Sequence, residues 1–123
     1  MVLTQDTIDR SAVEAARVLD EGKGRNIILL DLSPISAFAD YFIIATGDSH
    51  VHMQALANQV RQTLSQTETK ITSSEGRDSK TWILLDYGSI IIHIMSEQAR
   101  NYYGLETLWG DAEEIDWTVS LGT

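Results

Sequence analysis

Cysteine is absent from this sequence of 123 residues, and proline occurs only once. Without cysteine the chain can form neither a disulfide framework nor a thiolate metal site, which is typical of a protein from a reducing compartment. A single proline and eight glycines argue against a disordered or collagen-like chain. Because this length is near the commonest size of one domain, we expect a single domain over residues 1–123, located in the cytoplasm.

Long hydrophobic runs are also missing. The longest lies within residues 90–95, and His93 interrupts it. A helix that spans a membrane needs roughly 18 apolar residues, so we expect no membrane span. The first residues show neither the pattern of a secretory signal nor an arginine-rich bias, so we expect no targeting signal.

Positive charge is scarce. Nine lysines and arginines stand against 18 acidic residues, which gives a formal net charge of −9. This balance disfavours nonspecific attraction to nucleic acid or to an anionic membrane, and it makes a basic protein the natural partner. The segment after Gly104 contains acidic residues and no lysine or arginine. A run of this kind is usually a solvated tail that aids solubility.

Apolar residues at helical spacing predict three helices. The first covers residues 4–21, and the third covers about 96–103. The second follows the N-cap residue Ser49 and ends near Thr67. Its predicted apolar stripe consists of Met53, Leu56, Ala57, Val60 and Leu64.

Short apolar and β-branched runs predict strands over residues 26–31, 41–46, 82–86 and 90–95. A glycine-containing turn at Gly88 joins the last two as a tight hairpin. In the polar stretch before them, Ile71 centres a further short strand, and a turn or loop follows it. The predicted order is α-β-β-α-β-β-β-α. We therefore expect an α/β fold of the α+β kind, with a mixed, mostly five-stranded sheet and flanking helices.

Histidines provide the first candidates for metal ligands. His50 and His52 lie beside Asp48 in the expected first turn of a helix. Helical residues two positions apart point about 200° away from each other, so the two imidazoles would meet at one ion only in an extended segment. A polar first turn is the favoured interpretation, and we expect no metal site. His93, flanked by isoleucines, is interpreted as a hydrogen-bonded structural histidine.

Motifs of nucleophilic and nucleotide chemistry are missing. The sequence contains no Gly-x-Ser-x-Gly, no Gly-x-Gly-x-x-Gly and no Walker lysine. The turn with Gly47 and Ser49 precedes a helix, a context that can bind phosphate. Nucleotidyl transfer would also need paired carboxylates on a strand, and Asp86 stands alone. A turn with an N-cap is therefore favoured, and we expect no enzyme and no cofactor.

One predicted strand carries an aromatic and acidic surface. Trp82, Leu84 and Asp86 share one face of this strand, while Ile83, Leu85 and Tyr87 share the other. Both faces are apolar, so alternation does not decide which face is covered by a helix. Trp82 is either a core residue or the aromatic anchor of an interface. Our predicted partner-binding residues are Trp82, Leu84, Asp86, Tyr87, Tyr103 and Glu106.

Several blocks along the chain resemble the ribosomal silencing factor family, also called the Iojap family. The blocks are Asp31, Ser33, Ser36, Asp40-Tyr41-Phe42, Thr46-Gly47, Ser49 and His52, then Trp82, Leu84, Asp86-Tyr87-Gly88 and His93, then Arg100, Tyr102-Tyr103, Leu105-Glu106 and Leu108-Trp109. They follow one another in the family's order and span nearly the whole chain.

The resemblance implies a translational repressor of bacteria or organelles. Such a factor binds a basic protein of the large ribosomal subunit, ribosomal protein fourteen, and blocks association with the small subunit when nutrients are scarce. The resemblance also implies homodimers and a fold similar to that of nucleotidyltransferases, without their catalytic carboxylates. The alternative function is a nucleotidyltransferase-like enzyme that uses Gly47 and Ser49 for phosphate and Asp86 for metal.

Overall fold

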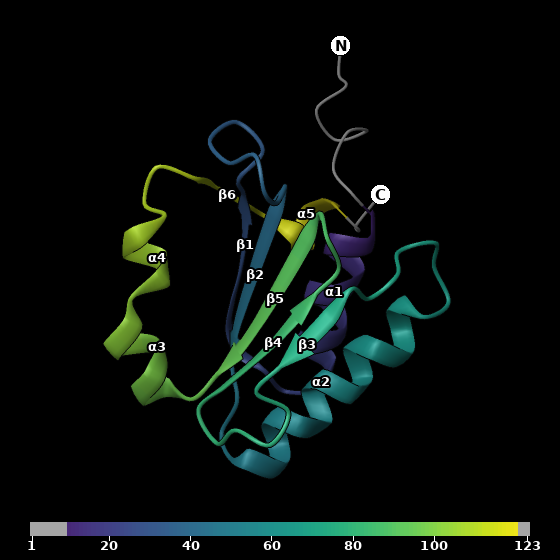
Figure 1. Ribbon diagram of the computed structural model, residues 1–123, viewed down its shortest axis with the longest axis vertical. Coiled ribbons are helices and arrows are strands. Elements are labelled where there is room, and N and C mark those ends of the chain that lie inside the picture. Colours follow the sequence, from purple (N-terminus) through teal and green to yellow (C-terminus); the bar gives the residue numbers. More distant parts are fainter. Residues whose placement is uncertain (1–9, 121–123) are drawn as a thin grey trace.

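A computed structural model describes residues 10–120 of the chain (Figure 1). Its centre is a six-stranded mixed sheet with the strand order β3-β4-β5-β2-β1-β6. Only the β2–β5 pair is parallel among the five strand pairs of the described residues. The strands are β1 (Arg25–Asp31), β2 (Tyr41–Thr46), β3 (Ser73–Glu75), β4 (Trp82–Asp86), β5 (Ile90–Met95) and β6 (Glu113–Ile115).

Helices cover the two faces of the sheet unequally. Helices α1 (Arg10–Glu21) and α2 (His50–Leu64) pack on one face and form the main core with β2, β4 and β5. Helix α3 (Glu97–Tyr103) and the short α4 (Leu105–Leu108) border the other face, where a smaller apolar cluster forms. The short helix α5 (Trp117–Ser120) follows β6. The fold is therefore the predicted mixed α/β sheet with flanking helices.

Helix α2 illustrates how local sequence determines an element. The Ser49 hydroxyl accepts a hydrogen bond from the His52 backbone N–H at 3.0 Å, which confirms the predicted N-cap. All five residues of the predicted apolar stripe are buried. The helix ends at Leu64, slightly before the predicted end near Thr67. The first predicted helix is described from Arg10 onward, and residues 4–9 lie outside the described residues.

The weakest predicted strand is displaced along the chain. β3 covers Ser73–Glu75, and Ile71 lies outside it. Its residues are all exposed, so apolar burial does not determine its position. Pairing with β4 does, because Ser73 lies opposite Asp86 and Glu75 lies opposite Leu84.

The acidic segment after Gly104 is not a solvated tail, and that prediction is wrong. It contains α4, β6 and α5, and β6 pairs antiparallel with β1, with Ile115 opposite Leu29. Ile115 packs against the main core, while Glu113 and Glu114 are exposed. β6 also makes the sheet six-stranded, so the predicted element order holds only through α3.

No helix within residues 10–120 combines the length and the apolar character that crossing a membrane requires.

Candidate functional site

Strand β4 turns its two sets of side chains toward different environments. Ile83 and Leu85 are buried in the main core under α1 and α2. Trp82, Leu84 and Asp86 are only partly buried and lie on the other side of the sheet. We call the side of Trp82, Leu84 and Asp86 the open face, and the side of Ile83 and Leu85 the closed face. The helices therefore cover the face of Ile83 and Leu85, a choice that the alternating sequence alone left undecided.

Trp82 is held at the open face by specific contacts. Its indole Nε1–H donates a hydrogen bond to His93 Nδ1 at 3.0 Å. Its ring lies 4.9 Å from the ring of Tyr103, between centroids, in a tilted arrangement. Trp82 thus packs against the smaller apolar cluster and still exposes part of its indole, as an oriented aromatic anchor does.

His93 is the buried side chain that contacts Trp82. It is only 3% exposed, and burial lowers the pKa of its imidazole from 6.5 to about 4. It is therefore neutral near pH 7, which leaves Nδ1 free to accept the Trp82 hydrogen bond. Its ring also contacts Phe42 at a centroid distance of 4.6 Å. The predicted structural, hydrogen-bonded histidine is confirmed.

An ion pair fixes α3 and α4 against the sheet. Arg100, only 7% exposed, donates to both carboxylate oxygens of Glu106, at 3.1 and 3.0 Å. Its third nitrogen donates to the Thr46 hydroxyl at 2.9 Å. Gly104, with φ of 59°, makes the left-handed turn that lets the two short helices bend around this pair. The arrangement places Tyr103 over the open face.

Comparison with known proteins identifies the family. The model of the family described as "Ribosomal silencing factor during starvation" matches residues 4–121. A ribosomal silencing factor from Chromobacterium violaceum is 41% identical over 103 residues, which are 84% of this chain and 82% of that protein. A crystal structure of a protein from the same organism is 37% identical with a TM-score of 0.77, covering 84% of this chain and 88% of that one. This chain belongs to the ribosomal silencing factor family.

More distant matches extend into organelles. A mouse protein named "Mitochondrial assembly of ribosomal large subunit protein 1" is 30% identical over 95 residues. The match covers 75% of this chain and 42% of the mouse protein.

Five of the six predicted partner-binding residues lie on the side of the sheet bordered by α3 and α4. Trp82, Leu84 and Asp86 project from β4, and the ring of Tyr103, which is 53% exposed, contacts the ring of Trp82 in a tilted arrangement. Glu106 lies on the same side, where its carboxylate forms an ion pair with Arg100. Tyr87 is separate, because it is 7% exposed in the main core, where burial raises the pKa of its phenol. Tyr87 is therefore not part of the open face.

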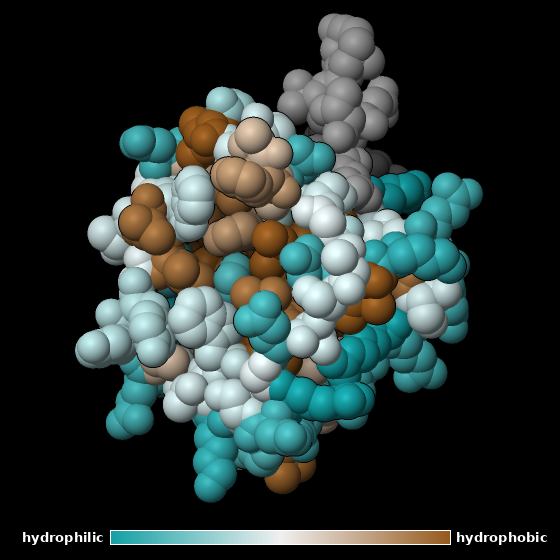
Figure 2. All heavy atoms as spheres, viewed as in Figure 1, coloured by the Kyte–Doolittle hydropathy of each residue, from teal (hydrophilic) through white to brown (hydrophobic). Residues whose placement is uncertain are grey.

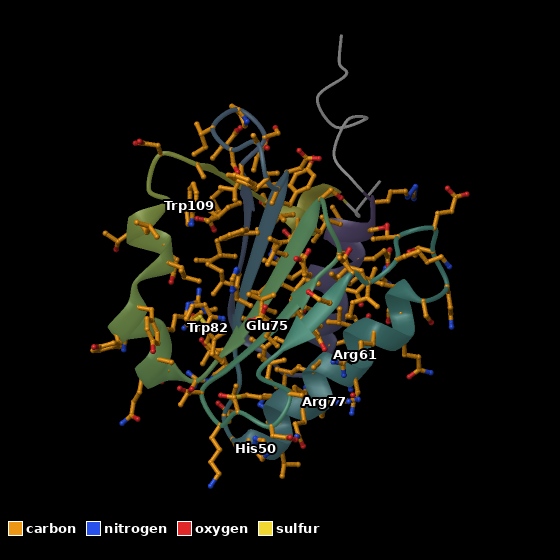
Figure 3. The ribbon with its side chains drawn as sticks, in the orientation of Figure 1. His50, Arg61, Glu75, Arg77, Trp82 and Trp109 are labelled. Carbon is orange, nitrogen blue, oxygen red and sulfur yellow. The ribbon has the colours of Figure 1, made fainter. Side chains whose placement is uncertain are left out.

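Sequence reasoning missed a hollow beside Trp82. A cavity of about 300 Å³ is lined by Glu75, Gly76, Ser79, Trp82 and Leu84. Figure 3 shows Glu75 beside Trp82 on the side of the sheet nearest the viewer. Glu75 lies in an exposed three-residue strand without an apolar pattern, so nothing in the sequence marked it.

The surface of the chain is uneven in polarity. Figure 2 shows hydrophobic residues gathered over α4 and the upper end of the sheet, whereas α2 presents mainly hydrophilic residues. Tyr102 is 83% and Leu108 is 71% exposed on α3 and α4. The apolar surface thus continues from Trp82 onto these two helices.

The histidines considered as metal ligands have separate backbone partners. His50 Nδ1 lies 3.0 Å from the Ser79 carbonyl oxygen. His52 Nδ1 accepts from the Asp48 N–H at 2.9 Å, and its Nε2 lies 2.8 Å from the Gly22 carbonyl oxygen. The described residues contain no group of three or more side chains suited to hold a metal ion. Both imidazoles therefore join loops to the start of α2.

The residues of the alternative nucleotide site lie apart. Thr46, before Gly47, is paired with Met95, whereas Asp86 is paired with Ile91. Met95 lies four positions after Ile91, so Thr46 and Asp86 lie about 13 Å apart along the direction of the strands. The turn with Gly47 and the carboxylate of Asp86 therefore lie beside opposite ends of β5, too far apart to hold one phosphate and its metal together.

Proposed function

We propose that this chain represses translation by binding the large ribosomal subunit through its open face and blocking association with the small subunit. The proposed contact is ribosomal protein fourteen, and the proposed location is the cytoplasm. Membership of the ribosomal silencing factor family supports the ribosomal role. The name of the mouse relative, which refers to the ribosomal large subunit, supports the choice of subunit.

The partly exposed Trp82 carries the proposal. It is ordered by His93 and Tyr103, so little freedom remains to be lost when a partner packs on it. Tryptophan and tyrosine are the residues most often found at the energetic centre of a protein interface. Leu84 and Asp86 extend this surface along β4.

Charge favours a protein partner over RNA. The chain carries a net charge of −9, so ribosomal RNA repels it and exposed basic protein attracts it. Within the proposed surface, Asp86 adds a negative charge, although its carboxylate also accepts a hydrogen bond from the Gly88 N–H at 2.7 Å. Attraction confined to basic protein would direct the chain to one region of the subunit.

A bound domain can prevent subunit joining without any chemistry, because it occupies the surface that the small subunit needs. We therefore propose a non-catalytic factor. The separation of Gly47 from Asp86 argues against a nucleotidyltransferase-like enzyme. A homodimer, implied by the family resemblance, belongs to the same proposal, since the exposed Tyr102 and Leu108 offer apolar area to a second copy.

Sedimentation with purified ribosomal subunits tests the proposed function. The parent chain should migrate with the large subunit and reduce the fraction of joined ribosomes. Trp82→Ala should weaken large-subunit binding about thirtyfold, because truncating a central aromatic anchor costs about 2 kcal/mol. Trp117→Ala is the matched control, since Trp117 packs against the main core, away from the open face.

Melting temperatures of both variants separate binding from folding. The proposal fails if the parent migrates only with the small subunit or with neither subunit. If Trp117→Ala and Trp82→Ala are both folded and bind the large subunit equally well, the open face is not the binding surface.

A further inference from the structure

The hollow beside Trp82 is built by a close approach of two backbone segments. Gly76 has φ of 74°, and a Cβ there would lie 2.0 Å from the Trp82 carbonyl oxygen. Glycine therefore allows the loop after β3 to pass directly against the start of β4. The hollow that results has a volume of about 300 Å³, with room for the end of one long side chain.

The lining combines an apolar wall with one acid. Trp82 and Leu84 project from alternate positions of β4 on the open face, and Glu75 lies directly opposite Leu84 on β3. Residues opposite each other in an antiparallel pair point to the same side of the sheet. The carboxylate of Glu75 is thus carried beside the aromatic and aliphatic surface.

Glu75 has no ion pair with any other residue of the described range 10–120. By contrast, Arg25 is paired with Asp48, and Arg100 is paired with Glu106. An unpaired carboxylate at the rim of an apolar hollow disfavours a neutral or acidic occupant, which would remove water from the charge and give nothing in return. A cationic occupant restores the lost interaction.

We propose that this hollow receives the side chain of one lysine or arginine of the partner protein. The methylene stem lies along Trp82 and Leu84, and the cationic end meets Glu75 and the indole. Long basic side chains bury their stems on apolar surface while the charged end stays near water, and a cation is attracted to the face of tryptophan. This inference rests on the proposed function, because it specifies the kind of side chain that the basic partner inserts.

Glu75 is the specificity-determining residue of this site. Trp82 and Leu84 would also accept a neutral apolar chain, whereas the carboxylate of Glu75 supplies the full negative charge that favours a cation. The loss of one exposed negative charge elsewhere on a chain of net charge −9 changes the long-range attraction but not a local pair. The contribution of the local pair to binding is therefore measured by comparing a substitution of Glu75 with the same substitution of a glutamate at another edge of the molecule.

The experiment measures binding of the full chain to purified large ribosomal subunits at several salt concentrations. Glu75→Gln should weaken binding about fivefold, and Glu75→Lys should weaken it about thirtyfold, because the reversed charge repels the inserted cation. Both variants should also reduce the salt dependence of the affinity. Glu114→Gln and Glu114→Lys are matched controls, since Glu114 is exposed on β6 at the opposite edge of the sheet.

The outcomes are distinct. Weakening at Glu75 that clearly exceeds weakening at Glu114 supports the site. Equal weakening at both positions would mean that Glu75 acts only through the net charge of the chain, and it would overturn the proposed site. Parent-like binding by Glu75→Lys would also overturn it. Those results leave the proposed function intact, since the parent still binds the subunit. A parent chain that does not bind the large subunit overturns the proposed function and this inference with it.

Discussion

The two faces of the sheet differ in what covers them, although they are built from the same strands. The closed face lies under α1 and α2 and carries an almost wholly apolar cluster that includes Leu19, Ile43, Leu56 and Leu85. The apolar cluster on the side of the open face contains only five buried residues, and partly buried apolar residues pack against it. We propose that the closed face supplies most of the stability, and that the open face presents side chains to the proposed partner.

The open face also contains buried polar groups. His93 and Arg100 are both buried there, and each binds a residue of the predicted interface, Trp82 or Glu106. Hydrogen bonds give these side chains fixed directions, which apolar packing alone does not. Polarity on this face therefore orients the aromatic surface.

The largest expected contrast is between two neighbouring leucines of β4. Leu85→Ala should lower the free energy of unfolding by about 3 kcal/mol, because it opens a cavity in the closed face. Leu84→Ala, on the open face, should lower it by about 1 kcal/mol, because that side chain is only partly buried. Urea denaturation of both variants measures the difference. Equal losses would contradict the division between the faces.

These leucines also show what the sequence could predict. Alternation in β4 separates Leu84 from Leu85, and the same alternation puts Tyr87 with Leu85, where the structure has it. Strong local patterns likewise gave β2 at its observed bounds and the Ser49 cap of α2. Such features depend on residues that are neighbours in the sequence, so they can be inferred from it.

Features that depend on distant residues were missed. β6 is a three-residue strand with two glutamates, and it exists because β1 offers it an edge to pair with. Arg100 and Glu106 are six residues apart, a spacing that brings side chains together only when Gly104 breaks the helix between them. Glu75 reaches the site through the register of β3 against β4.

A second prediction concerns the pH dependence of the open face. Burial lowers the pKa of His93 to about 4, whereas in the unfolded chain it titrates near 6.5. Between these values the unfolded state binds a proton that the folded state does not. The stability that comes from burying the neutral imidazole is fully present above pH 6.5, falls as the pH decreases and is lost below pH 4. The free energy of unfolding of the parent should therefore be about 2 kcal/mol lower at pH 5 than at pH 7.

His93→Asn tests this second prediction. Asparagine keeps an acceptor for the Trp82 indole N–H but does not titrate. Urea denaturation at pH 7 and pH 5 should show a smaller loss for the variant than for the parent, by about 2 kcal/mol. Identical losses in the two proteins would assign the acid sensitivity to the carboxylates and remove His93 from the explanation.

The smallest predicted effect concerns the ion pair that holds the helices of the open face. Glu106→Gln removes the negative charge facing the buried Arg100, and because Glu106 is 36% exposed, solvent reduces the loss to about 1 kcal/mol. Glu97→Gln is the matched control on α3, since Glu97 is 66% exposed and pairs with the exposed Arg25, and it should change stability by less than about 0.5 kcal/mol.

The same pair of variants distinguishes positioning from direct contact. If Glu106 acts by fixing α3 and α4, its substitution should displace Tyr103 and alter the ring contact with Trp82. The indole N–H resonance of Trp82 in the free protein should then shift in Glu106→Gln and stay in place in Glu97→Gln. An unmoved resonance together with weaker binding to the large subunit would instead make Glu106 a contact residue. In that case the aromatic pair would keep its geometry without the ion pair, and the open face would be held by apolar packing as the closed face is.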